Sequence, residues 1–340
     1  MTGTRISVQL PPNIDPTKAP VAFGDRAVPR LSRELRSAEL LTRQRALMSL
    51  CDLVRDPERA YELIQAGCLE SLKLLLCDED STVRLKTTEL LYLLANHNSG
   101  REALLSSDVI SPLSDLLEEP LEACRWNTHR VLQALAELPP GALGVLEAGL
   151  VPRLVLRLSK EGEAVQELIL TTLGSCLRVD ALPALASDGV SALRVSLIHP
   201  SPRVRAPAAR ALVAISVPLE GKVKLCEEGV VPELVRLLGD DNAEVRGHAA
   251  AALMNTAVTT QGKFLALEAG AVPALLVLAQ CPGAVESCNA LRCLTCLAEA
   301  PPGRAQLLPY VPLLQQRLSH PSDIVRQAAL TAIQVITWTP

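Results

Sequence analysis

The chain has 340 residues, of which 49% are hydrophobic and only 2% are aromatic, and its formal net charge is −4. Positive and negative side chains are interspersed without a run of Lys or Arg, and few rings are present for base stacking, so nucleic acid is not an implied partner. The start of the chain lacks a charged-then-apolar leader pattern, and no apolar run approaches the roughly 20 residues of a membrane span, which predicts a soluble intracellular protein without a membrane partner.

The first 25 residues differ in composition from the rest of the chain. Four Pro residues lie between positions 10 and 20, where they disfavour both helix and sheet. We therefore expect an extended Pro-rich arm over residues 1–25. Two interpretations stay open: a disordered tail, or an arm that becomes ordered against a partner or the first repeat. In the second interpretation, apolar Ile14 and Phe23 are candidate partner-binding residues.

A repeated pattern occupies the chain from residue 26 onward. A small residue followed two positions later by Val-Pro or Leu-Pro, as at Gly229, recurs in clear or weaker form every 39 to 41 residues. A Gly that opens an apolar run, as at Gly221, and an aliphatic residue followed by Arg, as at Val245 and Arg246, recur with the same period. A fixed period in this range marks a solenoid of helical repeats. Eight units begin near positions 26, 67, 108, 149, 189, 229, 270 and 309.

Each unit is predicted to contain three helices. A short helix follows the Gly-Arg or Gly-Lys pair, a second helix begins at the Val-Pro pair, and a long helix begins at the aliphatic-Arg pair. In the long segment 245–257, Val245, Ala249 and Leu253 follow helical spacing. A Pro in the first turn removes an N–H that has no partner within the helix, and a Gly just before it is a natural stop for the preceding helix. This order favours armadillo over HEAT repeats, which usually have two helices.

The predicted fold class is all-α, an armadillo/HEAT-like right-handed superhelical solenoid of about eight repeats of roughly 40 residues. We expect one elongated domain over residues 26–340, because no single unit can bury its apolar face without its neighbours. A solenoid usually presents a long surface and no catalytic cleft, so the functional question becomes which partner the protein binds.

Residues that could perform chemistry do not form a recognisable set. The chain has no Gly-rich phosphate loop, no Gly-x-Ser-x-Gly and no His-Glu-x-x-His motif. His199 and His320 precede Pro-Ser at equivalent repeat positions, which indicates turn residues. Most of the ten Cys occupy apolar helix positions, and although Cys293 and Cys296 have metal-like spacing, no second pair accompanies them. We therefore expect no enzyme, no catalytic, cofactor or metal site, and no small-molecule substrate.

The long helices supply the candidate partner-binding residues, because in armadillo proteins these helices line the concave face. Positions one, five and nine residues after the Arg that opens each long helix share one helix face. The candidates at these positions are Trp126, Arg130, Arg210 and Asn255. A Trp–Arg pair is typical of an interface hot spot. The alternatives are that Trp126 packs between neighbouring units and that both Arg side chains are solvated or salt-bridged.

Known armadillo grooves provide a further comparison. Nuclear-import adaptors of this fold hold an extended basic peptide with ladders of Trp and Asn at the fifth and ninth positions. In this chain Asn255 alone matches that pattern, so an import-like adaptor is poorly supported. A groove like that of β-catenin would need a line of basic residues, and Arg130 with Arg210 is too short a line to indicate one.

Two segments carry a more specific resemblance. They are the Pro-rich stretch 10–20 with Ala22, Phe23 and Gly24 after it, and the stretch 40–53, which begins Leu-Leu-Thr-Arg-Gln-Arg. Together they resemble an armadillo-repeat family of radial spoke head proteins, and the similarity extends over essentially the whole chain. The resemblance implies a structural component of the axonemal radial spoke in motile cilia and flagella, with other radial spoke proteins as partners. The alternative is a soluble armadillo adaptor that binds extended peptides or assembly cargo.

Overall fold

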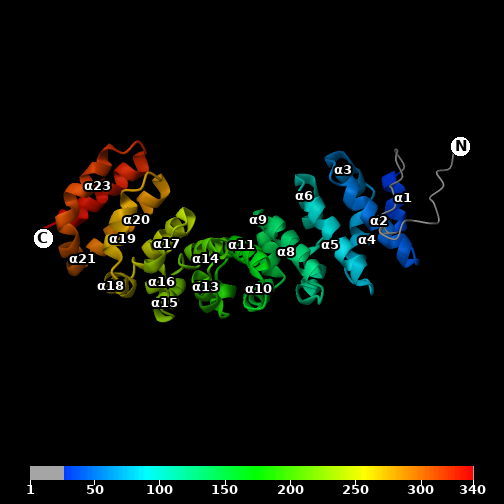
Figure 1. Cartoon of the computed structure of the whole chain (residues 1–340), viewed down its shortest axis with the longest axis horizontal. Helices are drawn as coiled ribbons and strands as arrows, with labels where there is room; N and C mark the ends of the chain where they lie inside the picture. The colour runs from blue at the N-terminus through cyan, green and yellow to red at the C-terminus, as the bar shows by residue number, and fades with distance from the viewer. Residues whose placement is uncertain (1–26, 340) are drawn as a thin grey trace. The chain divides into compact units, whose positions relative to one another are not determined.

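A computed structural model describes residues 27–339, where helices are the regular elements of the chain. The chain forms two compact units, Met1–Ala148 and Gly149–Pro340, and each is described by itself. Within each unit the helices stack in successive layers, which confirms the predicted α-solenoid fold (Figure 1). The predicted arm, with Ile14 and Phe23, lies outside the described residues.

The three predicted helix types, named here the short, second and long helices, are present in unit 1. The long helices are α2 (Leu40–Leu53), α5 (Ser81–Ala95) and α8 (Glu122–Ala136). The second helices are α1 (Ala27–Glu34), α4 (Cys68–Leu75) and α7 (Ile110–Leu113), the last continued by the 3-10 helix η1 (Ser114–Glu118). The short helices are α3 (Pro57–Gln65), α6 (Asn98–Ser106) and α9 (Pro139–Glu147).

Unit 2 repeats the same order. Its long helices are α11 (Glu163–Val179), α14 (Pro202–Ile215), α17 (Ala243–Thr256), α20 (Ala284–Ala298) and α23 (Asp323–Thr337). Its second helices are α10 (Leu150–Leu158), α13 (Gly189–Leu197), α16 (Val230–Leu237), α19 (Ala271–Ala279) and α22 (Val311–Gln315), the last continued by η3 (Gln316–Ser319). Its short helices are α12 (Leu182–Leu185), α15 (Leu219–Glu227), α18 (Thr260–Glu268) and α21 (Pro301–Leu307), the last continued by η2 (Leu308–Tyr310).

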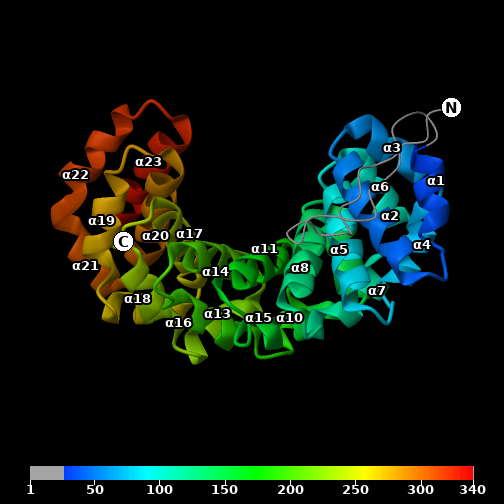
Figure 2. The same ribbon diagram turned by 45° about the vertical axis from the view of Figure 1, so that its right-hand side comes forward.

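Long helices of consecutive repeats pack against each other within each unit. In unit 1, α5 contacts both α2 and α8, and in unit 2 the helices α11, α14, α17, α20 and α23 pack in series. Figure 2 shows α13 and α16 on the opposite side of unit 2 from α14 and α17. Side chains such as Leu90 and Leu94 in α5, and Ala208 and Leu212 in α14, are fully buried between these layers. Small residues such as Ala allow the long helices to approach closely.

The long helices span only a few turns, with 15 residues in α5 and 14 in α14. Among the described helices, none by itself has the length and apolar composition of a membrane span. The helices α18 and α19 meet that test only as a pair, joined across a bend of 91°.

The turn before a second helix explains the Gly of the repeated pattern at Gly67, Gly149, Gly229 and Gly270, which all have a positive φ. Gly229 precedes α16 with φ 66°, a left-handed conformation that most side chains disfavour. The stop for the preceding helix that the sequence predicts at this Gly is therefore present, directly after α15. In unit 1 the equivalent residue before α7 is Asp108, which adopts φ 52°. Asp is among the few residues that tolerate this region, so the turn is kept there without Gly.

A close approach of two helices explains the other recurring Gly. Gly221 lies in the first turn of the short helix α15, directly beside the end of the long helix α14. A Cβ atom added at Gly221 would lie 1.7 Å from the carbonyl oxygen of Ile215. Any side chain at this position would therefore push α15 away from α14, which is why a Gly opens the short helices with the repeat period.

Candidate binding surface

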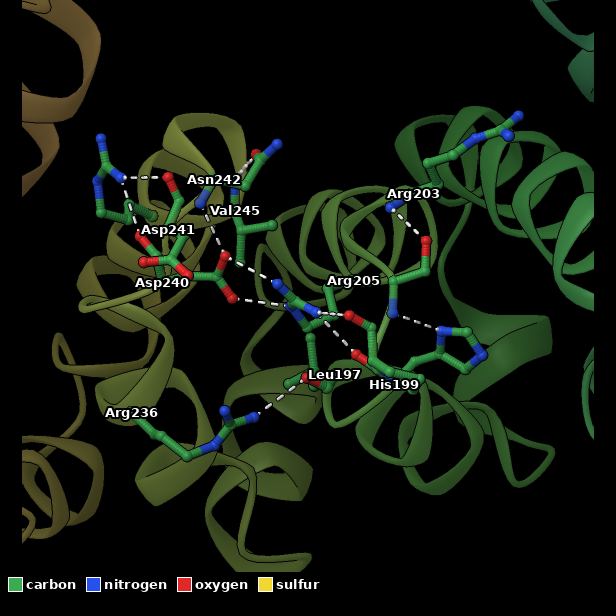
Figure 3. Close-up of polar contacts among 12 residues, drawn as sticks. Leu197, His199, Arg203, Arg205, Arg236, Asp240, Asp241, Asn242 and Val245 are labelled. Atoms are coloured by element: carbon green, nitrogen blue, oxygen red, sulfur yellow. Dashed lines mark hydrogen bonds and ion pairs between the residues drawn. The ribbon is translucent and has the colours of Figure 1, made fainter.

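The Arg that opens a long helix links two consecutive repeats. In α14, Nη1 of Arg205 donates hydrogen bonds to the backbone carbonyls of His199 and Pro200, at 2.9 and 2.6 Å. Nε and Nη2 of the same side chain donate to the two carboxylate oxygens of Asp240, at 2.8 and 3.0 Å (Figure 3). Asp240 lies in the turn before the next long helix, α17. One guanidinium therefore closes its own turn and holds the turn of the next repeat.

The same arrangement recurs, and we name its members the corner arginines: Arg43, Arg84, Arg205 and Arg246. Each donates to two carbonyls of its own turn and pairs with an acid of the next repeat, Asp78, Glu119, Asp240 and Glu286 respectively. The first three acids lie 35 residues after their Arg, so the spacing of these pairs can also be read from the sequence. The periodic Arg is therefore explained by stability rather than by binding.

The contact between Arg205 and Asp240 changes the pKa of the Asp240 carboxyl group. Burial alone would raise the pKa of its carboxyl group. The hydrogen bonds from Arg205 and from the Asn242 N–H, together with the positive charges of Arg205 and Arg236, outweigh burial and leave the pKa of Asp240 below its ordinary value. The ionised form is therefore the one that the folded corner stabilises.

The histidines and cysteines that the sequence singled out have structural surroundings. Nδ1 of His199 accepts a hydrogen bond from the Ser201 N–H at 3.1 Å, and His320 accepts an equivalent bond from Ser322, which confirms both as turn residues. Burial raises the pKa of Cys176 to about 12, and burial, followed by the neighbouring Cys296, raises that of Cys293 well above its ordinary value. In agreement with the prediction that most Cys occupy apolar helix positions, five of them are buried in helices: Cys51, Cys176, Cys226, Cys288 and Cys293. Among residues 27–339, no group of three or more His, Cys, Asp or Glu side chains is placed to hold a metal ion.

In unit 1 the candidates Trp126 and Arg130 lie together on the long helix α8. The guanidinium carbon of Arg130 lies 4.2 Å from the ring centroid of Trp126 and 3.3 Å from that of Tyr92, which belongs to α5. Both distances are within the range of a cation–π interaction. Trp126 is 39% exposed, so its ring is part of the surface as well as a neighbour of Arg130. We name these three residues the aromatic–arginine cluster.

Sequence reasoning identified two members of this cluster and missed Tyr92. Arg130 is five residues after the Arg that opens α8, whereas Tyr92 is eight residues after the Arg that opens α5. The packing of neighbouring long helices brings these two positions together. Gly174 of α11 lies eight residues after Gln166, the residue that stands where Arg84 stands in α5, and it lies against Arg210 of α14. The register between long helices would therefore have identified Tyr92.

In unit 2 the candidate Arg210 has different surroundings. A Cβ atom added at Gly174 would lie 3.7 Å from Nε of Arg210, so no ring covers the guanidinium on that side. This Nε is buried and has no hydrogen-bond partner in the described part of the chain. Arg210 lines a hollow of about 300 Å³ together with Glu167, Thr171, Arg203, Ala206, Asn242 and Glu244. Glu167 is already paired with Arg203 at 2.6 Å, so the hollow contains charges of both signs.

The fourth described candidate, Asn255, bonds to its own chain. Its side-chain Nδ2 in α17 donates to the carbonyl oxygen of Val213 at 3.3 Å and to Oγ of Ser216 at 3.1 Å. Both acceptors lie at the end of the preceding long helix, α14. The amide group that would hold a peptide backbone in an import-like ladder therefore links two repeats in this protein.

Comparisons with known proteins agree with this architecture. A family described as HEAT-like repeat matches residues 202–255, although the three-helix order is the one expected of armadillo repeats. The chain is 27% identical over 241 residues to Radial spoke protein 14 of Chlamydomonas reinhardtii, a match covering 63% of this chain and 59% of that protein. The predicted resemblance to a radial spoke protein is thereby confirmed over 63% of the chain, and not over essentially the whole of it. The match spans less than two thirds of the length of that relative.

A solved structure extends the comparison of the fold. The crystal structure of an engineered protein has a TM-score of 0.79 at 22% sequence identity, and the match covers 92% of this chain and 89% of the engineered one. Similarity at this level of identity concerns the α-helical repeat fold alone.

Proposed function

We propose that this chain is a non-enzymatic structural scaffold of the axonemal radial spoke in motile cilia and flagella. It binds other radial spoke proteins through the faces of its long helices. The observation that carries this proposal is the similarity to Radial spoke protein 14 of Chlamydomonas reinhardtii. The cytoskeleton of the cilium or flagellum is the location that this role requires.

The chemistry of the repeats supports a binding role. The corner arginines and their acids are used in holding repeats together, and buried thiols with a raised pKa are poor nucleophiles. The aromatic–arginine cluster, in contrast, combines an exposed Trp with an Arg, the residue types that most often dominate protein interfaces. A solenoid suits such a role because its long surface is maintained by contacts between neighbouring repeats.

The alternative, a soluble adaptor that holds extended peptides, has less support from the surface. An adaptor of the import type relies on side-chain amides that are free to bond to a peptide backbone. The amide of Asn255 is instead bonded to Val213 and Ser216. The surface therefore favours the scaffold over the adaptor.

Affinity purification from ciliated cells tests the proposal. The tagged full chain is recovered under mild extraction, and the proteins that accompany it are quantified by mass spectrometry against the tag alone. We expect radial spoke subunits in fixed ratio to the chain. Recovery of many unrelated soluble proteins without any spoke subunit would contradict the proposal and favour the adaptor.

A further inference from the structure

The guanidinium of Arg130 is held in place by rings and has no polar partner among residues 27–339. Its carbon lies over the rings of Tyr92 and Trp126, at 3.3 and 4.2 Å. Within residues 27–339, none of its N–H groups takes part in a hydrogen bond or an ion pair. Nε of Arg210 is buried without a partner in the described part of the chain, but the nitrogens of Arg130 are not buried in this way. The N–H groups of Arg130 therefore reach solvent while the side chain is held from its faces.

A second stacked arginine provides the contrast. The guanidinium carbon of Arg304 lies 5.0 Å from the ring centroid of Trp338 in unit 2. Its Nε donates to the carbonyl oxygen of Ala298 at 3.2 Å, and its Nη1 donates to that of Trp338 at 3.4 Å. Arg304 thus uses its donors inside the repeat, as the corner arginines do. Both arginines stack on a Trp ring. Of the two, Arg130 is the one whose N–H groups have no acceptor among residues 27–339.

The chemistry of a stacked guanidinium determines what it can bind. Its N–H bonds lie in the plane of the group, so rings that cover its faces leave the N–H edge available. That edge matches the two oxygens of a carboxylate in a bidentate pair. Because Tyr92 and Trp126 already restrict the Arg130 side chain, less conformational freedom is lost when an anion binds. The exposed part of the Trp126 ring offers an apolar contact beside the same edge.

We propose that the aromatic–arginine cluster is a docking site for an acidic segment of a partner protein. An Asp or Glu carboxylate of that segment pairs with the N–H edge of Arg130, and a neighbouring apolar side chain packs on Trp126. Charge complementarity selects this occupant, because the cluster has a cation without a counter-ion among the described residues. The inference rests on the proposed role of the long-helix faces in binding spoke proteins, and it names the chemistry of the partner.

A peptide array tests this inference directly. The full chain is applied to short peptides that have a fixed central Glu, Gln or phosphoserine between randomised flanks. Arg130→Ala removes the guanidinium, and Arg304→Ala is the matched control because it removes a stacked arginine whose donors are used internally. We expect selection of Glu over Gln, at least about tenfold weaker binding by Arg130→Ala, and unchanged binding by Arg304→Ala.

The affinities of selected peptides are then measured by fluorescence. In a Trp338→Phe background Trp126 is the single tryptophan of the chain, so its emission reports binding beside Arg130. A saturable change with the Glu peptide, absent with its Gln counterpart, supports the proposal. Equal selection of Glu and Gln, preference for phosphoserine, or selection that survives Arg130→Ala would each overturn it. If spoke subunits still accompany the chain in cells after such a result, the proposed function stands and this docking site does not.

Discussion

Two positions on one helix, five residues apart, give arginine two different roles. Arg205 opens α14 and is 15% exposed, with two carbonyls and both oxygens of Asp240 as acceptors. Arg210, in the middle of the same helix, faces a hollow and has a buried Nε without a hydrogen-bond partner in the part of the chain that the structure describes. In unit 1, Arg130 occupies the position that corresponds to Arg210 and stacks on Tyr92 and Trp126.

The arginine at the start of a long helix maintains the repeat fold, whereas the arginine in the middle of the helix distinguishes one repeat from another. At the start of the long helix, each corner arginine finds the same kinds of acceptor, because the turn geometry is the same in each of these repeats. In the middle of the helix, the neighbour is Tyr92 in one unit and Gly174 in the other. The repeat fold therefore places an arginine in the middle of both long helices, and the residues around that arginine decide what its side chain can bind.

The largest expected effect comes from adding a side chain at Gly221, where α15 approaches the end of α14. In Gly221→Ala the new Cβ would meet the Ile215 carbonyl oxygen at 1.7 Å, so α15 must move away from α14. We expect a loss of about 3 kcal/mol or more in the free energy of unfolding, measured by urea denaturation followed by circular dichroism. Gly239→Ala is the control, because its Cβ would meet its nearest atom at 3.7 Å, and it should change stability by less than about 0.5 kcal/mol.

Removal of a corner arginine should have the next largest effect. Arg205→Ala leaves Asp240 without its partner and frees two turn carbonyls, which we expect to cost about 2–3 kcal/mol of unfolding free energy. Arg203→Ala, on the same helix, removes a side chain that is 65% exposed and should cost less than about 1 kcal/mol. Equal losses in the two variants would show that the corner has no special role in stability.

The corner also predicts a dependence on pH. Because the pKa of Asp240 is lower in the folded chain than its ordinary value of 3.8, its contribution to stability is present above pH 3.8 and is lost as the pH falls through the folded-state value. The difference in unfolding free energy between wild type and Asp240→Asn should therefore shrink on acidification below pH 3.8. Chemical denaturation over a pH series measures it, and a difference that grows on acidification would contradict this assignment.

The smallest effect on stability is expected in the middle of the helix. Arg210→Ala removes a guanidinium that has no ion pair or hydrogen bond within the described residues, so the free energy of unfolding should change by less than about 1 kcal/mol. Thermal melting of Arg210→Ala beside Arg205→Ala measures the contrast on one helix. A larger loss in Arg210→Ala than in Arg205→Ala would reverse the comparison.

The sequence predicts the architecture well for physical reasons that individual residues illustrate. The period is visible because Gly221, Gly229 and Arg205 each meet a backbone requirement that recurs in neighbouring repeats. Trp126 and Arg130 could be paired because they lie four residues apart on one predicted helix. Tyr92 could not be added without the register between neighbouring long helices, and nothing local to Asn255 indicates that its amide bonds to Ser216.

The division between corner and mid-helix arginines is tested most directly by two variants of unit 1, Arg84→Ala and Arg130→Ala. Arg84 pairs with Glu119 at 2.7 Å and donates to the carbonyls of Asp78 and Glu79, whereas the contacts of the Arg130 guanidinium within residues 27–339 are with rings and not with polar atoms. Each tagged variant is assayed for unfolding free energy and for the spoke subunits that it captures from ciliated cells. We predict that Arg84→Ala loses about 2–3 kcal/mol, and that Arg130→Ala loses less than about 1 kcal/mol but most of its captured subunits. Equal destabilisation by both variants, or full capture by Arg130→Ala, would contradict the account.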